Sequence, residues 1–176
     1  MIETARRKRL AGRGLFIVLF LAILFLRLMP LNPGQVVWPG PDISLCLTLA
    51  WVLRRPDHAP VLIIALLFLI EDIMLFRPLG LWTAIVVMGS EAARSRELRW
   101  RELPFMVEWL RVAMLMAMLM LGYRIVLAVF FLPMPPLGQV ILQFIATTAA
   151  YPIVVGLLRW PLGLRRGLSE ADTRYR

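Results

Sequence analysis

Long, uninterrupted apolar runs constrain this chain more than any other feature of its sequence. The first lies between Leu15 and Leu28, and further runs recur along the chain with short basic segments between them. Helices of soluble domains carry their apolar residues as a stripe, whereas these runs are apolar on all sides. Apolar residues make up 60% of the chain, against about 45–50% in ordinary soluble domains. The sequence therefore predicts an all-α, polytopic membrane protein with a single domain.

Six apolar runs are expected to cross the membrane. They occupy residues 14–31, 43–53, 60–76, 79–93, 104–131 and 137–158, and Pro152 interrupts the last one. The second run is short for a full crossing unless residues 36–38 join it, so a re-entrant or steeply tilted segment is the alternative. The chain is thus divided into a basic N-terminal segment (1–13), a six-helix transmembrane domain (14–164) and a C-terminal tail (165–176).

The basic residues predict the orientation of these spans. Sixteen arginine and lysine residues fall in segments on one side of the expected membrane, and Arg77 alone falls in the loops of the opposite side. Cytoplasmic loops are enriched in Lys and Arg, so both termini are expected in the cytoplasm. The net charge of +9 follows from the same clusters. Because no nucleic-acid-binding motif accompanies it, we expect no nucleic-acid partner.

Two adjacent acids, Glu71 and Asp72, lie in the middle of the third run. At about 1.5 Å per residue they are roughly 17–18 Å from the start of that run, and Arg27 lies about 20 Å along the first. The similar depths predict a buried pair between Arg27 and one of the acids. Neighbouring residues point about 100° apart on a helix, so the other acid needs a different partner. A structural or inter-subunit contact is favoured over the alternative, an ion or proton relay.

Three further charges are embedded in the fifth run. Glu108 and Arg111 are three residues apart, so they are expected to form a self-contained pair that reaches the membrane surface. Arg124 lies near the opposite end of the run and is expected to extend toward water. In the neighbouring fourth run, Glu91 has the same three-residue spacing to Arg94.

The sequence gives little support for catalysis. A single histidine, His58, and a single cysteine, Cys46, leave no cluster for a metal ion. The serines have no histidine in a suitable context, and nucleotide-binding glycine patterns are absent. We therefore expect a protein that is not an enzyme and has no cofactor.

The order of these features resembles a known family. Pro41-Asp42 opens a short span that ends in AWVLRRPDHAP, a span with Asp72 follows, and then come Pro78-Leu79-Gly80-Leu81 and EAARSR. This order is similar to the rod shape-determining protein MreD family, in its alphaproteobacterial form. The most specific element is the span-three aspartate followed within about eight residues by Pro-x-Gly, here Asp72, Pro78 and Gly80. Many members carry glycines just before that aspartate, where this chain has Phe68-Leu69-Ile70-Glu71.

The resemblance implies a non-catalytic inner-membrane subunit of the rod complex, or elongasome, which maintains cell shape and synthesises lateral peptidoglycan. Such a subunit would bind MreC, a single-span protein, and act through it on the RodA glycosyltransferase and its class B penicillin-binding partner. The family also resembles in fold the substrate-binding subunits of energy-coupling-factor vitamin transporters. Asp72 and the Pro78–Leu81 turn would then be packing or partner-contact positions, with Asp72 holding the hairpin or receiving a partner's polar group.

A different class of function is compatible with the same charges. A small-solute binding subunit of a membrane transporter would place a hydrated cavity near Glu71, Asp72 and Arg27. Membrane lipids are expected to surround the chain in either case.

Overall fold

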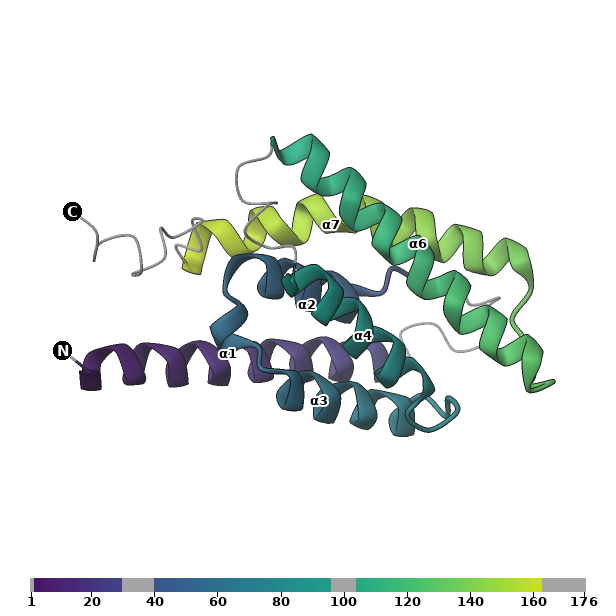
Figure 1. The fold of residues 1–176 in the computed structure, drawn as a ribbon, viewed down its shortest axis with the longest axis horizontal. Helices are drawn as coiled ribbons and strands as arrows, with labels where there is room; N and C mark the ends of the chain where they lie inside the picture. The colour runs from purple at the N-terminus through teal and green to yellow at the C-terminus, as the bar shows by residue number, and fades with distance from the viewer. Residues whose placement is uncertain (1, 30–39, 96–103, 163–176) are drawn as a thin grey trace.

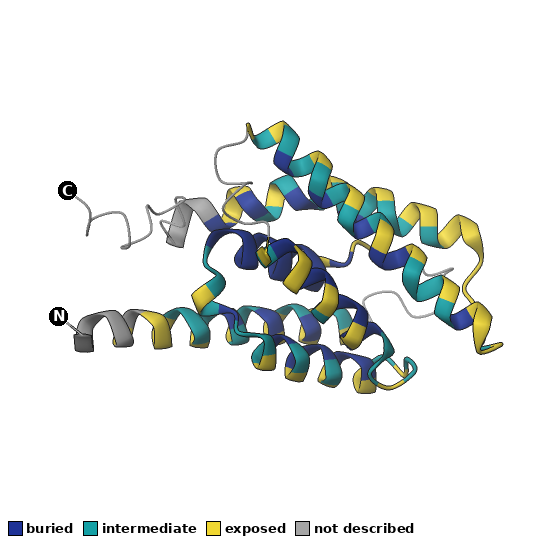
Figure 2. Cartoon of the chain, viewed as in Figure 1, coloured by how far each residue is buried: buried dark blue, intermediate teal, exposed yellow. Residues whose placement is uncertain are grey.

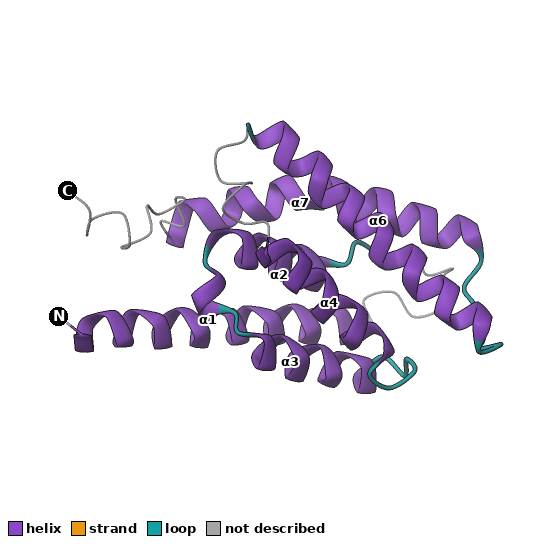
Figure 3. Cartoon of the chain, viewed as in Figure 1, coloured by secondary structure: helices purple, strands orange, loops and turns teal. Residues whose placement is uncertain are grey.

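The computed structural model describes residues 2–29, 40–95 and 104–162, and these residues contain helices and loops but no strand (Figure 3). The expected all-α class is confirmed for this part of the chain. The helices are α1 (Ile2–Leu28), α2 (Ile43–Arg54), α3 (Val61–Met74), α4 (Leu81–Ser95), α6 (Phe105–Val129) and α7 (Leu137–Leu162), with a short 3₁₀ turn, η1, at Pro56–His58. Three sequence expectations lie outside the described residues: the contribution of residues 36–38 to the second span, the arginines between residues 96 and 101, and the tail 165–176.

Three of the described helices are long and apolar enough to cross a membrane. They are the part of α1 from Arg9 to Leu28, α6, and the part of α7 from Leu137 to Leu158. The other three have 12, 14 and 15 residues, which corresponds to roughly 18–23 Å of helix. The basic segment 1–13 is not separate from the first apolar run, because α1 begins at Ile2 and continues through both.

The short helix α2 occupies the centre of the molecule. Every residue from Ser44 to Arg54 is buried, and α2 packs against α1, α4 and α7 (Figure 1). Figure 2 shows the consequence, since α2 is almost wholly buried whereas α6 and α7 expose much of their outer surface. On α6 the exposed residues include Met114 and Met118, and the buried ones include Met116 and Met120. A helix that is apolar on all sides and only 12 residues long is stable in this position because other helices cover every side of it.

The helix α7 continues through Pro152, contrary to the expected interruption. A proline inside a helix has no N–H to donate, which leaves the carbonyl four residues earlier without its usual partner. That carbonyl belongs to Thr148, and the indole Nε1 of Trp109 donates to it at 2.9 Å. Trp109 therefore replaces the missing backbone bond and joins α6 to α7.

The helices α4 and α6 approach closely at Gly89. A Cβ atom built on Gly89 would lie 2.6 Å from Cδ2 of Leu119, which is itself buried. Small residues at such contacts let transmembrane helices pack backbone to side chain without a gap.

We therefore expect Gly89→Ala to destabilise the protein by about 1–3 kcal/mol, because overpacking of a buried contact forces its neighbours to move. Gly122→Ala on α6 is the matched control, since a Cβ there would meet nothing within 4 Å. Alanine is the better helix former, so the control is expected to stabilise slightly. Reversible unfolding in mixed detergent micelles measures both, and equal effects of the two substitutions would contradict the close α4–α6 contact.

Candidate functional site

The buried charges gather in two networks, one at each end of the helix bundle. The far end, away from the N-terminus, contains the α3–α4 and α6–α7 connections and the start of α2 (Figure 1). The near end contains the end of α2, η1 and the start of α6. Most of the residues that were singled out from the sequence lie at the far end, namely Arg27, Glu71, Asp72, Pro78 and Gly80.

Arg27 and Glu71 form the ion pair that the comparison of depths predicted. Arg27 Nη1 lies 2.7 Å from Glu71 Oε1, and the carboxylate is completely buried. Arg77 reaches the same oxygen at 3.7 Å, and Arg27 also lies 3.6 Å from Asp42 Oδ1. Glu71 therefore meets two guanidinium groups, from α1 and from the α3–α4 turn, which supplies the compensation that a buried carboxylate requires.

Asp42 contributes to this network, although the sequence did not mark it as a site residue. It is the N-cap of α2, and its Oδ1 accepts a hydrogen bond from the Leu45 amide at 3.2 Å. Its own amide donates to Thr147 Oγ1 of α7 at 2.9 Å. An aspartate directly before an apolar helix is a common N-cap signal, so the capping role could have been found from the sequence. Its approach to Arg27 could not, because that depends on how α1 packs on α2.

Asp72 points to a different partner from its neighbour Glu71, as the helical geometry required. Its Oδ2 accepts two hydrogen bonds from Thr83, one from the amide at 3.1 Å and one from Oγ1 at 2.8 Å. Thr83 is in the first turn of α4, whose amides have no partner inside the helix. Gly80 occupies the N-cap position of α4, and it has no side chain that could accept a hydrogen bond from these amides. Asp72 thus caps α4 from α3, and the helix dipole favours the negative charge.

The backbone of Asp72 fixes the other side of the same turn. Its carbonyl accepts from the Arg77 amide at 3.0 Å, while the Phe76 amide donates to Ile73 at 3.3 Å. Phe76 has φ 52°, so this is a Schellman ending of α3 with phenylalanine where glycine is usual. Gly80 then takes φ +76°, which suits its lack of a Cβ. Asp72, Pro78 and Gly80 therefore belong to one structural unit, the α3–α4 hairpin.

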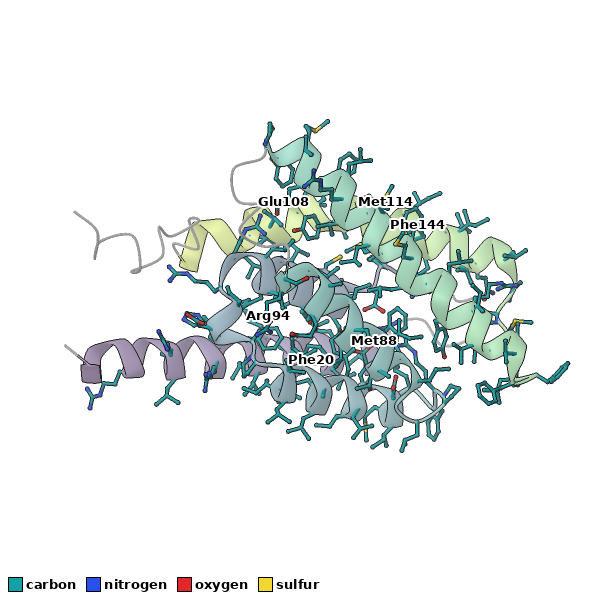
Figure 4. The ribbon with its side chains drawn as sticks, in the orientation of Figure 1. Phe20, Met88, Arg94, Glu108, Met114 and Phe144 are labelled. Carbon is teal, nitrogen blue, oxygen red and sulfur yellow. The ribbon has the colours of Figure 1, made fainter. Side chains whose placement is uncertain are left out.

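The near network joins α2, α6 and α7 through Glu108. Glu108 Oε1 accepts hydrogen bonds from Arg54 Nη2 and from the Tyr151 hydroxyl, each at 3.0 Å (Figure 4 labels Glu108). The expected self-contained pair with Arg111 is wrong for Glu108, because the carboxylate is buried and turned toward the neighbouring helices. Arg111 is half-buried and also interacts with other groups. In the sequence, Arg54 lies at the start of a basic loop, and the spacing of Tyr151 does not indicate that it belongs to this network.

The remaining charges behave more simply. Arg124 donates to the carbonyl of Pro135 at 2.8 Å, and the Glu91–Arg94 pair forms at 3.0 Å as the spacing predicted. In η1, outside the long apolar segments, burial and the nearby Arg55 lower the pKa of His58 from its ordinary value of 6.5. The His58 ring is therefore neutral at pH 7, and it packs against Gly12 of α1.

Cavities lie beside the far network, and the described residues contain no cluster suited to a metal ion. A cavity of about 240 Å³ at the far end is lined by residues that include Asp42, Arg77 and Tyr123, and one of about 190 Å³ borders Arg27. Glu71 and Asp72 are completely buried by protein. Among the residues of these three ranges, no group of three His, Cys, Asp or Glu side chains could hold a metal ion.

Comparison with known proteins adds no identification: no protein-family model, no curated protein and no solved structure matches this chain.

The Arg27–Glu71 pair yields a stability prediction. Removing Arg27 leaves a buried carboxylate with a weaker partner, so Arg27→Met is expected to cost about 3 kcal/mol. Arg9→Met is the matched control on the same helix, because Arg9 is exposed and lies 3.9 Å from Asp57, a surface contact worth about 0–1 kcal/mol. The double variant Arg27→Met/Glu71→Gln should recover at least about 1 kcal/mol of the summed losses in detergent unfolding. Strictly additive losses would show that the pair is not coupled.

The capping role of Asp72 can be tested by graded substitutions. Asp72→Ala removes both bonds to Thr83 and should cost about 2 kcal/mol. Asp72→Asn keeps an acceptor oxygen and should lose about half as much, and Thr83→Val removes only the hydroxyl donor. The same unfolding measurement applies, and an Asp72→Asn variant as unstable as Asp72→Ala would mean that hydrogen bonding to α4 is not what Asp72 contributes.

Proposed function

We propose that this chain is a non-catalytic, multi-pass subunit of the rod complex in the bacterial inner membrane, with six membrane segments and both termini in the cytoplasm. The observation that carries the proposal is the hairpin unit. The three residues on which the resemblance to the MreD family chiefly rests, Asp72, Pro78 and Gly80, lie in one turn whose two ends are both bonded to Asp72. A motif that builds one local structure is a more specific likeness than three separate matches.

The surroundings of the charges support an interaction protein. Glu71, Asp72 and Glu108 are all buried and bonded to groups on other helices. They therefore stabilise the arrangement of helices and do not face a substrate. The hairpin tip, in contrast, exposes large apolar side chains, with Phe76 97% and Leu79 72% exposed. In this proposal the tip contacts MreC, and through MreC the subunit acts on RodA and its class B penicillin-binding partner.

The transporter alternative receives less support. It places a hydrated cavity at Glu71 and Asp72, whereas both side chains have no exposed surface. Of the three residues that it requires, Arg27 borders a cavity of about 190 Å³, and the cavity of about 240 Å³ is lined by other residues.

Detergent co-purification with the MreC-like protein of the same organism tests the proposal. Wild-type chain should capture it, and Asp72→Ala and Leu79→Ala should reduce capture at least about fivefold, a loss of roughly 1 kcal/mol. Leu62→Ala is the control, because Leu62 is 77% exposed near the other end of α3 and should leave capture unchanged. No capture by folded wild-type protein, together with a melting temperature raised by a small solute, would replace this function with the transporter subunit.

A further inference from the structure

The larger cavity lies at the far end of the bundle, beside the first turn of α4, the last turns of α6 and the first turns of α7. Its volume is about 240 Å³, somewhat below the roughly 300–1,000 Å³ of sites for drug-sized molecules. It therefore has room for a group about as large as a lipid headgroup.

Hydrogen-bond donors dominate the polar part of its lining. Arg77, Trp82, Tyr123, Arg124 and Gln143 all line it, and each carries at least one N–H or O–H. Trp82 is 4% exposed, and its Nε1 has no hydrogen-bond partner in the described part of the structure.

The donors are also held together by direct contacts. The guanidinium of Arg77 stacks 5.6 Å from the centre of the Trp82 ring, and that ring meets Tyr123 edge-to-face at 5.3 Å. The Arg77 guanidinium is thereby held in place in advance of ligand binding, which lowers the ordering cost of binding.

Acceptors are few and already engaged. Asp42 is the one acid that lines this cavity, and its carboxylate caps Leu45 and lies 3.6 Å from Arg27. Arg124 uses one N–H on the Pro135 carbonyl and retains others, because a guanidinium has five. Arg77 shares Glu71 with Arg27, whereas Arg124 forms no ion pair with an acid among the described residues. The positive charge of Arg124 therefore favours an oxyanion.

The depth of the cavity identifies where that oxyanion would come from. At about 1.5 Å per residue, Arg124 lies roughly 28 Å from Phe105 along α6, close to the edge of a hydrocarbon core about 30 Å thick. The remaining lining, which includes Met120, Leu127 and Val140, is apolar. A cationic wall beside an apolar one at this depth matches a phosphate group with its acyl chains in the membrane.

We propose that this cavity binds the phosphate group of an anionic phospholipid. The inference rests on the membrane insertion stated in the proposed function, but not on the rod-complex partner. Phosphate is also available as the free ion, so the test separates the two sources.

Native mass spectrometry of the delipidated full chain, titrated with dioleoyl-phosphatidylglycerol or with dioleoylglycerol, provides the test. The two lipids share their chains and differ in the phosphoglycerol headgroup. The phosphatidylglycerol is expected to bind at least about tenfold more tightly, and Arg124→Gln to weaken its binding about tenfold. Tyr123→Phe and Gln143→Leu keep the charge and the fold-stabilising ion pairs, and each should weaken binding about threefold. Arg9→Gln makes the same charge change as Arg124→Gln at the near end and should have no effect.

Inorganic phosphate distinguishes the sources. If it displaces the phosphatidylglycerol, and Arg124→Gln abolishes this competition, the oxyanion alone is the ligand. If it does not compete while the phosphatidylglycerol binds, the lipid headgroup is the ligand. Equal binding of the two lipids, or equal effects of Arg124→Gln and Arg9→Gln, would overturn the proposal. Loss of MreC capture with intact lipid binding would refute only the rod-complex function.

Discussion

The compensation of buried charge is the constraint on which the rest of this structure depends. A carboxylate such as Glu71 is costly away from water unless a cation and hydrogen bonds accompany it. Arg27 from α1 and Arg77 from the α3–α4 turn supply that compensation. Because the three groups come from separate segments, their pairing fixes how far α1 and α3 extend relative to each other. Apolar helix surfaces by themselves do not select one packing register, so in an apolar bundle such polar contacts determine it.

A second consequence is that the start of α4 and the irregularity in α7 are satisfied by side chains from other helices. Asp72 caps α4 from α3, and Trp109 replaces the bond that Pro152 removes from α7. Glu108 receives both Arg54 and Tyr151. Each of these bonds compensates a polar group that would otherwise be unpaired in an apolar surrounding. The fold is therefore held by a small number of interhelical polar contacts, together with the packing around α2.

This division of roles connects the fold to the two proposals. The buried acids are used internally, so in the proposed function the exposed hairpin tip is the part that contacts a partner. The cavity near Arg77 and Arg124 differs from the buried networks because Arg124, unlike Arg77, is bonded to a backbone carbonyl and to no acid in the described part of the chain. The same far end of the bundle thus carries a surface suited to a protein and a recess suited to a phosphate.

The sequence by itself determined the class of the protein and the chemistry of its interior. The solid apolar runs form helices, of which three in the described residues are long and apolar enough to cross a membrane. The depths of the charges along those runs place Arg27 level with Glu71. The 100° step between neighbours also required Asp72 to have a different partner. These properties are local, since they depend on helix rise and rotation along one segment at a time.

Only the tertiary structure decided which helix is central and which distant groups meet. Nothing in residues 43–54 distinguishes a short crossing helix from a buried core helix, because both are apolar on all sides. The partner of Glu108 was likewise decided by packing: Arg111 is near in sequence, but Arg54 and Tyr151 are the groups that α2 and α7 bring to the buried carboxylate. Sequence spacing ranks partners within one helix, whereas a contact between helices depends on their relative rotation and height, which the whole bundle sets together.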